Sequence, residues 1–215
     1  MRLFKGFSRT KLYVSLLLAK NYNNRCVMPL KYYSIKTIKQ CYYENNIYLD
    51  LYNDSKNDSK NDLKNDLKND FKKYSKYNDL TAEHVFPQSF TKHYLKANKD
   101  MHNIYLTNYY TNNLRSNKKF SHFKTETISN KIYIPCNYSR GIIARALVYM
   151  KYTYPLLNLS SVIDHDIIIL WNELYPPNDY EFKKNNIIYK YQGNKNIFIE
   201  DSKMLAQFIN NNFNL

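Results

Sequence analysis

Cysteine is scarce in this chain of 215 residues, which contains three. Cys26, Cys41 and Cys136 form no Cys-x-x-Cys pair, and an odd number of cysteines does not make an even disulfide framework. The sequence therefore does not support a disulfide-stapled core. A zinc site is equally unsupported, because the cysteine spacing of such sites is missing.

The N-terminal part lacks a long hydrophobic run, and no acidic residue precedes Glu44. The apolar run Leu12–Ala19 has eight residues, too few to cross a bilayer as a helix, so no transmembrane segment is predicted there. Such a run after basic residues fits a secretory signal, whereas the acid-free basic continuation through Lys39 is typical of an organelle transit peptide. We predict that residues 1–50 target the protein to a mitochondrion or plastid. Secretion is the alternative, and a disordered basic tail is the third interpretation.

A low-complexity segment follows the basic opening. Residues 53–72 repeat Asn-Asp-x-Lys five times, with opposite charges in balance and little apolar surface to bury. A period of four residues is too short for the supersecondary unit of a solenoid. We predict a solvated linker over residues 51–77 and one folded domain over residues 78–215.

Net charge favours a polyanionic partner. The chain carries a formal charge of +14, and from Leu80 onwards sixteen Lys and Arg face ten Asp and Glu. The predicted domain therefore keeps a positive excess of its own, as phosphate binding requires. Charge alone is weak support, because lysine is also abundant in proteins from A+T-rich genomes.

The stretch Thr81–Asn117 contains the residue types that metal-assisted phosphodiester hydrolysis requires. Such hydrolysis needs a general base, a divalent ion and hard oxygen ligands. His84 can be the base, and Glu83 points to the other side of an extended segment, where its carboxylate can bind the ion. Asn112 can add a neutral carbonyl oxygen.

Local patterns around these residues predict two strands and a helix. We expect Glu83–Phe86 to be extended and to end at Pro87, which lacks a backbone donor. A second strand is expected at Asn103–Thr107, and a short helix at Tyr109–Leu114 carries Asn112 back across the hairpin. Downstream, apolar spacing and helix-stop residues predict four more helices, at Gly141–Tyr152, Asp164–Leu174, Glu181–Tyr191 and Asp201–Phe208. The predicted fold class is α+β.

Three motifs together resemble the core of the endonuclease I family, secreted or periplasmic nucleases with a ββα-metal (His-Me finger) site. They are Glu-His-Val-Phe-Pro from Glu83, Asp-Met-His-Asn from Asp100, and Asn-x-x-Arg-Ser-Asn from Asn112. Further matches follow in family order, so the resemblance covers about residues 80 to 200. It implies a largely sequence-nonspecific endonuclease that leaves 5′-phosphate and 3′-hydroxyl ends on DNA, with RNA left open as a substrate.

The resemblance also implies roles for single residues. His84 is the general base, and Glu83 and Asn112 bind Mg²⁺ or another divalent cation such as Ca²⁺ or Mn²⁺, with Asn113 as the neighbour easily confused with Asn112. Asn103 is expected to brace the loop through hydrogen bonds. Arginines at family positions are expected to bind phosphate oxygens, although a structural salt bridge is the open alternative for each: Arg115, Arg140 and Arg145.

Two other functions remain open at this point. A catalytically inactive, basic nucleic-acid-binding protein of an organelle would use Tyr109, Tyr110 and nearby lysines to stack bases and bind phosphates. A structural protein of an organellar ribosome would explain the charge. Neither function requires Glu83, His84 and Asn112 together, so the presence of this trio favours the nuclease. On this interpretation a chain beginning at Lys73 folds and cleaves like the full chain, and the oligomeric state is undetermined.

Overall fold

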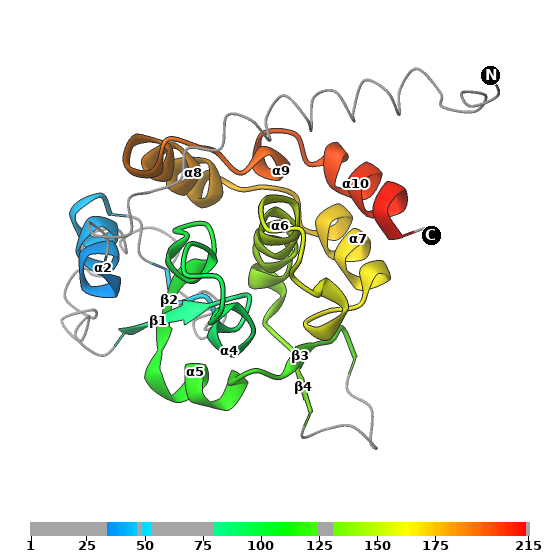
Figure 1. The fold of residues 1–215 in the computed structure, drawn as a ribbon, viewed down its shortest axis with the longest axis horizontal. Helices are drawn as coiled ribbons and strands as arrows, with labels where there is room; N and C mark the ends of the chain where they lie inside the picture. The colour runs from blue at the N-terminus through cyan, green and yellow to red at the C-terminus, as the bar shows by residue number, and fades with distance from the viewer. Residues whose placement is uncertain (1–33, 47–48, 53–79, 124–130, 214–215) are drawn as a thin grey trace, which may run out of the picture.

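The computed structural model describes residues 34–46, 49–52, 80–123 and 131–213. The predicted targeting segment up to residue 33 and the Asn-Asp-x-Lys repeat lie outside these ranges. Helices surround a small hairpin (Figure 1), so the fold is α+β as the sequence predicted. Among the described helices, none combines the length and the apolar character needed to cross a membrane.

A hairpin and a helix form the part that carries the predicted trio. Strand β1 (Leu80–His84) pairs antiparallel with β2 (Ile104–Asn108), and helix α5 (Tyr109–Arg115) follows β2 directly. The side chain of Asn108 accepts a hydrogen bond from the Tyr110 amide and thereby caps α5. Strand β1 overlaps the predicted extended segment Glu83–Phe86 only at Glu83 and His84, since it begins three residues earlier and ends two residues earlier. Strand β2 is shifted by one residue from the predicted Asn103–Thr107.

Short helices connect the two strands of the hairpin. Pro87 ends the extended segment and precedes α4 (Gln88–Thr91), and the 3₁₀-helix η2 (Ala97–Lys99) follows. Asp100 then anchors the connection, since its carboxylate accepts hydrogen bonds from the His102 amide at 2.9 Å and the Tyr149 hydroxyl at 3.0 Å. The Asp-Met-His motif therefore ties the hairpin to the long helix behind it.

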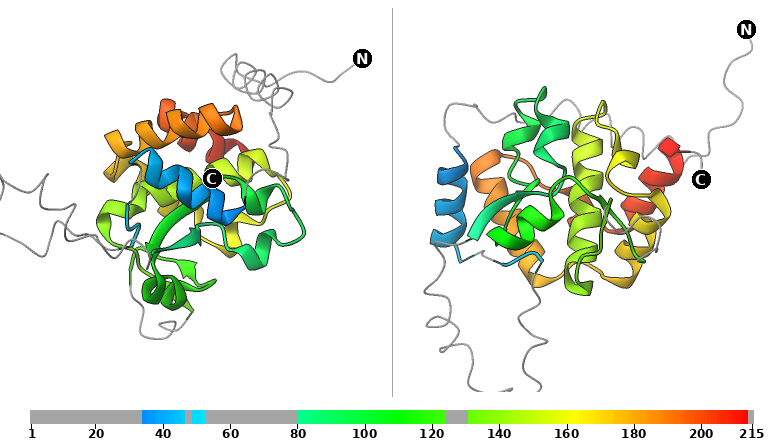
Figure 2. Two further views of the ribbon diagram at one scale, coloured as in Figure 1. Left: turned by 90° about the vertical axis from the view of Figure 1, so that its left-hand side faces the viewer. Right: turned by 90° about the horizontal axis from the view of Figure 1, so that it is seen from below.

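The long helix α6 (Asn137–Thr153) lies at the centre of the molecule (Figures 1 and 2), and most of its side chains are buried. Four helices follow it: α7 (His165–Leu174), α8 (Asp179–Gln192), α9 (Ile197–Glu200) and α10 (Lys203–Phe213). The 3₁₀-helix η3 (Leu159–Ser161) lies between α6 and α7, while β3 (Lys119–Phe120) pairs with β4 (Ile132–Tyr133) in parallel. The hairpin packs on one side of α6 and the helices α7 and α10 pack on the other.

The ends of these helices follow the signals in the sequence. Tyr154 ends α6 one residue before Pro155. Gly193 ends α8 with a φ of 82°, a left-handed conformation that glycine adopts without a steric penalty. The carboxylate of Asp201 accepts a hydrogen bond from the Lys203 amide, so it caps α10 as predicted.

Gly141 allows α6 to approach the chain that follows α7. A Cβ atom at this position would lie 2.1 Å from the carbonyl oxygen of Tyr175 and 2.6 Å from Nη2 of Arg145. Both distances are far below van der Waals contact, so no larger residue fits without moving the backbone. The contact between α6 and α7 therefore depends on glycine at this position.

The folded part begins earlier than the sequence predicted. Helix α2 (Ile35–Glu44) buries Ile38 and Tyr42 against the hairpin, and Asp50 forms a parallel β-bridge with Leu106. Leu51 and Tyr52, which follow Asp50, lie in the main core. The predicted start near Asn78 is therefore wrong for residues 34–46 and 49–52, whose packing against the hairpin depends on contacts distant in sequence.

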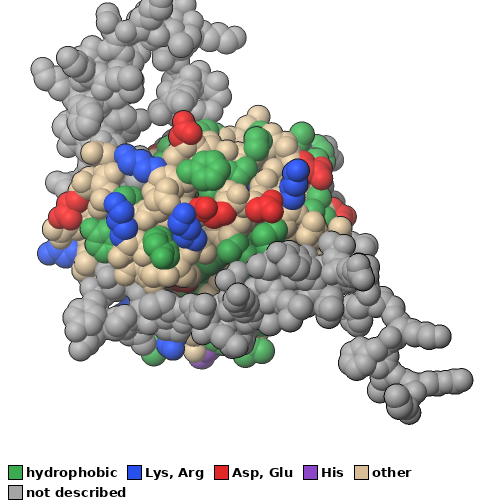
Figure 3. Space-filling model, turned by 90° about the horizontal axis from the view of Figure 1, so that it is seen from above, with side chains coloured by type: hydrophobic (Ala, Val, Ile, Leu, Met, Phe, Trp, Pro, Cys, Tyr) green, Lys and Arg blue, Asp and Glu red, His purple; other side chains and the backbone are tan. Residues whose placement is uncertain are grey.

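Charged side chains of both signs occur on the outer face of the helical part. In the space-filling view of Figure 3, Lys and Arg side chains alternate with Asp and Glu side chains among hydrophobic ones. The positive excess of the chain is thus not concentrated on the visible part of this face.

Candidate active site

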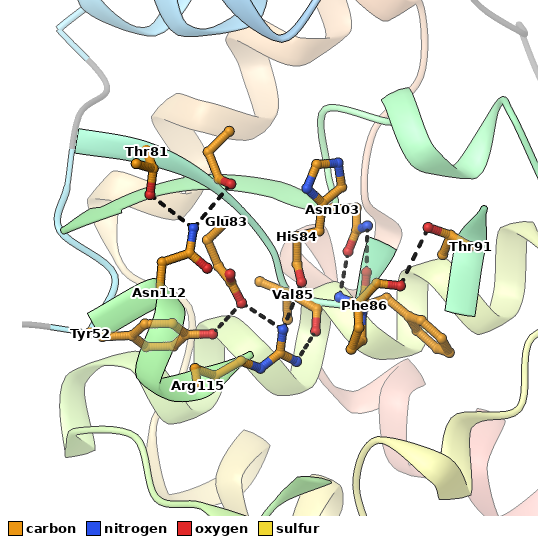
Figure 4. Close-up of polar contacts among 12 residues, drawn as sticks. Tyr52, Thr81, Glu83, His84, Val85, Phe86, Thr91, Asn103, Asn112 and Arg115 are labelled. Carbon is orange, nitrogen blue, oxygen red and sulfur yellow. Dashed lines mark hydrogen bonds and ion pairs between the residues drawn. The ribbon is translucent and has the colours of Figure 1, made fainter. Parts of the chain in front are cut away.

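The Glu83 carboxylate lies in the interior, at the end of β1. Its Oε1 atom accepts hydrogen bonds from the Tyr52 hydroxyl at 2.6 Å and from Nη1 of Arg115 at 2.7 Å (Figure 4). Among the described residues, none donates a hydrogen bond to the other oxygen, Oε2. The carboxylate is therefore held through one oxygen, and both described donors leave the second oxygen open.

Burial and ion pairing shift the pKa of Glu83 in opposite directions. Desolvation raises the pKa of Glu83, while the adjacent Arg115 guanidinium and the hydrogen bond from Tyr52 lower it. The burial effect is the larger, so the net pKa lies above the ordinary value. A cation bound to Oε2 would stabilise the ionised form of this carboxylate.

Arg115 lies below the hairpin rather than on the surface. It is 1% exposed, forms the ion pair with Glu83, and also donates to the backbone carbonyls of His84 and Val85. Its guanidinium lies 4.4 Å from the ring centroid of Phe120. The structure gives Arg115 the salt-bridge arrangement, while the residue also lines the cavity described below, so its phosphate contact stays a prediction.

His84 has a defined hydrogen-bond partner. Its Nε2 atom lies 2.9 Å from the carbonyl oxygen of Asn98, which can only accept, so Nε2 carries the proton and Nδ1 holds the free electron pair. Burial lowers the pKa of His84, and the nearby Arg115 lowers it further, against the opposing effect of the Asn98 carbonyl. The imidazole is therefore neutral at pH 7, as a general base must be.

Asn112 faces the hairpin from α5. Its Nδ2 atom donates to Oγ1 of Thr81 at 2.9 Å and to the Ala82 carbonyl at 3.3 Å, which orients the amide and leaves Oδ1 without a described donor. In Figure 4 this oxygen lies on the side of the Glu83 carboxylate. Asn113 is exposed on the helix surface, so the geometry distinguishes the two neighbours.

The trio lines one small pocket. A cavity of about 170 Å³ is bounded by eight residues: Ala82, Glu83, His84, Pro87, Gln88, Asn112, Arg115 and Ser116. Within the described ranges, no group of three His, Cys, Asp or Glu residues could bind a metal ion. One carboxylate oxygen and one amide oxygen nevertheless fit Mg²⁺, which keeps several water ligands and needs few from the protein.

Asn103 joins the two ends of the hairpin connection. Its Oδ1 atom accepts from the Phe86 amide at 2.7 Å and its Nδ2 atom donates to the Phe86 carbonyl at 3.1 Å. The side chain is fully buried and does not line the cavity. These bonds brace the segment that follows His84 and thereby help to orient the base.

Arg145 and Arg140 lie away from this cavity. Arg145 is buried and forms a bidentate ion pair with Glu181 at 2.7 and 2.6 Å, which joins α6 to α8. The expected phosphate contact is therefore not available to Arg145, and the salt-bridge alternative describes it. Arg140 is partly exposed, donates to the Pro135 carbonyl, and has its guanidinium 5.8 Å from the ring of Trp171.

Tyr52 was missed by the sequence analysis, although it contacts Glu83 directly. Thirty-one residues separate the two in sequence, and the repeat lies between them. No local pattern links such residues. The apolar pair Leu51 and Tyr52 just before a strongly polar repeat was the one signal that this segment could be buried.

Comparison with known proteins agrees with the motifs. The family model of endonuclease I matches residues 8–132 and 127–203, which together make up more than half of the chain. The first match extends over α2, residues 49–52 and the hairpin. The N-terminal part of the fold therefore belongs to the matched region.

Two curated relatives are similar over part of the chain. Endonuclease-1 of Buchnera aphidicola subsp. Baizongia pistaciae (strain Bp) is 29% identical over 119 residues, and the periplasmic deoxyribonuclease of Aeromonas hydrophila is 30% identical over 117 residues. Each alignment covers 49% of this chain and 48% of the relative. The chain thus spans about half the length of the curated relatives it matches.

These relatives contradict the predicted organelle location. Both relatives are bacterial and one is named as periplasmic, which speaks against a mitochondrial or plastid address. The composition of the first 39 residues misled the prediction, since a basic, acid-free opening is shared by transit peptides and secretory signals. The family match, together with the motifs around Glu83, His84 and Asn112, establishes that the chain belongs to the endonuclease I family.

Proposed function

We propose that the protein is a divalent-metal-dependent, largely sequence-nonspecific endonuclease that hydrolyses phosphodiester bonds of DNA. The observation that carries the proposal is that Glu83, His84 and Asn112 all line one cavity. The family membership and the printed names of the relatives support the same activity. RNA contains the same phosphodiester bond and is the second substrate to test.

Glu83 and Asn112 would hold the divalent cation. Their atoms Oε2 and Oδ1 lack described donors, and both residues line the cavity. Mg²⁺ is the proposed ion, with Ca²⁺ or Mn²⁺ as alternatives that share its preference for oxygen ligands. When bound, the ion supplies positive charge that stabilises the phosphate and the leaving oxygen.

His84 would accept the proton of the attacking water at Nδ1. The hydrogen bond from Nε2 to the Asn98 carbonyl fixes the tautomer and orients the ring, and it stabilises the imidazolium that forms after the transfer. The lowered pKa of His84 keeps the base neutral before the reaction. Asn103 would maintain the position of the backbone that carries His84.

The hairpin and α5 would form the ββα-metal core of the family. In this assignment β1 supplies the base and one ligand, α5 supplies the second ligand, and β2 fixes their separation by pairing His84 with Ile104. Two exposed tyrosines extend from the same helix, Tyr109 at 63% and Tyr110 at 74% exposure. They would contact the bases or sugars of the bound strand, and Arg140 would contact a phosphate.

The test is incubation of the full chain with supercoiled plasmid DNA and, separately, with RNA. We expect nicking and linearisation of the plasmid with Mg²⁺ and no cleavage with excess EDTA. The RNA arm distinguishes a deoxyribonuclease from a nuclease of both acids. Binding of DNA without cleavage under any divalent cation would contradict the proposal and favour a binding protein that has lost the chemistry.

A further inference from the structure

Tyr52 contributes a hydroxyl group to the candidate metal site from outside the hairpin. The donor oxygen lies 2.6 Å from Oε1 of Glu83, and both side chains are at most 5% exposed. In Figure 4 the phenol ring approaches the carboxylate from the side opposite β1. In the sequence Tyr52 stands immediately before the Asn-Asp-x-Lys repeat, and Glu83 follows shortly after it.

The segment that carries Tyr52 is anchored to β2 and α6. The Leu51 amide donates to the Leu106 carbonyl at 2.9 Å, and Oγ1 of Thr107 donates to Oδ1 of Asp50 at 2.7 Å. The hydroxyl of Ser139, on α6, donates to the Leu51 carbonyl. These bonds hold the backbone at Asp50 and Leu51, directly before Tyr52.

Packing fixes the Tyr52 ring as well. Its centroid lies 4.9 Å from that of Tyr133 and 6.5 Å from that of Phe120, both in tilted geometry. Phe120 also packs against the Arg115 guanidinium, so one aromatic cluster holds both donors to Glu83. The phenol hydroxyl has one proton to donate, and Oε1 of Glu83 accepts it.

The two donors to Glu83 converge on the same carboxylate oxygen. Arg115 alone could pair with both oxygens of Glu83, because a guanidinium binds a carboxylate best in a bidentate arrangement. That arrangement would occupy Oε2 and compete with a cation. The Tyr52 hydroxyl at Oε1 opposes the rotation that bidentate pairing requires.

We propose that Tyr52 is a positioning residue for the metal ligand Glu83, which it holds through Oε1 so that Oε2 faces the divalent cation. The role rests on the proposed function, since it assigns a task to Tyr52 within that site. It also makes the segment before the repeat part of the active site. Removing the hydroxyl should weaken Mg²⁺ binding while leaving His84 and the substrate surface in place.

The test compares Tyr52→Phe with the wild type in the full chain. We expect the Mg²⁺ concentration for half-maximal cleavage to rise about 10- to 100-fold, as for other partners that orient a metal ligand. The rate at saturating Mg²⁺ should stay within about three-fold of the wild type, because Tyr52 is not the base. Calorimetric titration with Mg²⁺ alone should give the same loss of affinity without DNA.

Tyr42→Phe is the matched control. Tyr42 is fully buried in α2, and its hydroxyl donates to the carbonyls of Met101 and Ile104, away from Glu83. Tyr42→Phe removes a hydroxyl oxygen from a buried ring, as Tyr52→Phe does. Its thermal stability should fall, while its Mg²⁺ midpoint should stay at the wild-type value. Equal shifts of the midpoint in both variants would overturn the positioning role.

Two outcomes separate this proposal from the proposed function. If the wild type cleaves with Mg²⁺ and Tyr52→Phe has an unchanged midpoint and affinity, only the role of Tyr52 is wrong. If the wild type neither cleaves nor binds Mg²⁺, the nuclease proposal fails and Tyr52 has no ligand to position. If Tyr52→Phe does not fold, Thr107→Val is the second variant, because it removes the hydrogen bond to Asp50 beside the Tyr52 segment. This variant should also raise the Mg²⁺ concentration for half-maximal cleavage. An unchanged Mg²⁺ midpoint in Thr107→Val would overturn the proposal.

Discussion

Nε2 of His84 lies 2.9 Å from the carbonyl oxygen of Asn98, and this contact decides which nitrogen can act as a base. The carbonyl accepts a hydrogen bond and cannot donate one, so the proton lies on Nε2. Asn98 belongs to η2, in the connection between the two strands. The short helix between β1 and β2 therefore sets the tautomer of a residue on β1.

Replacement of His84 by alanine should remove the base and little else. We expect the cleavage rate of His84→Ala to fall about 10²- to 10⁴-fold, the usual contribution of a general base. Affinity for DNA and thermal stability should remain close to the wild type. The measurement is plasmid cleavage under single-turnover conditions with preparations purified in parallel. A variant that cuts at the wild-type rate, in a preparation free of contaminating nuclease, would refute the assignment.

The pH dependence of cleavage should follow the lowered pKa of His84. Only the neutral imidazole accepts a proton, so kcat/KM should fall as the pH drops through this pKa, which lies below 6.5. From pH 6.5 to 8 the rate should change little. A pH profile measured at saturating Mg²⁺ tests this, and an acidic limb centred above 6.5 would contradict the burial argument.

Asn112 and Asn113 should differ in their effect on metal binding. Asn112→Ala removes an oxygen that faces the cavity and should lower Mg²⁺ affinity by about ten-fold or more. Asn113→Ala changes an exposed side chain on the same helix and serves as the control. Calorimetric titration with Mg²⁺ compares the two variants. Control of the affinity by Asn113 would show that the ligand assignment is shifted by one residue.

Gly141→Ala should destabilise the packing of α6 against α7. The added methyl group overlaps the Tyr175 carbonyl, and such overpacking costs about 1 to 3 kcal/mol of unfolding free energy. Asn186→Ala, at an exposed position within α8, is the control for a gain in helix propensity. Urea unfolding followed by circular dichroism measures both changes. Equal stability of the glycine variant and the wild type would contradict the close approach.

A chain that begins at Lys73 should fail to fold, contrary to the expectation from sequence. It lacks five buried side chains that precede the repeat: Ile38, Cys41, Tyr42, Leu51 and Tyr52. Burial of large hydrophobic side chains contributes about 1.5 to 3 kcal/mol each, so their loss is comparable with a total stability of about 5 to 15 kcal/mol. Thermal unfolding of residues 73–215 and of residues 34–215 tests this. Cooperative unfolding and cleavage by the shorter chain would restore the original expectation.

The sequence by itself determined the local features of this protein. Motif order identified the family, alternation of side chains placed Glu83 and His84 on opposite sides of a strand, and Gly193 and Asp201 marked helix ends that the structure contains. Each of these features depends on neighbours within a few residues, where backbone geometry links sequence to position.

Only the tertiary structure decided the roles that depend on distant contacts. Arg115 and Glu83 are 32 residues apart, and Arg145 and Glu181 are 36 apart, so no local pattern indicates whether these arginines face a phosphate or a buried carboxylate. The same holds for Tyr52, which reaches Glu83 across the repeat. Chain packing brings these groups together, because a buried charge is stable only beside a partner that compensates the lost hydration.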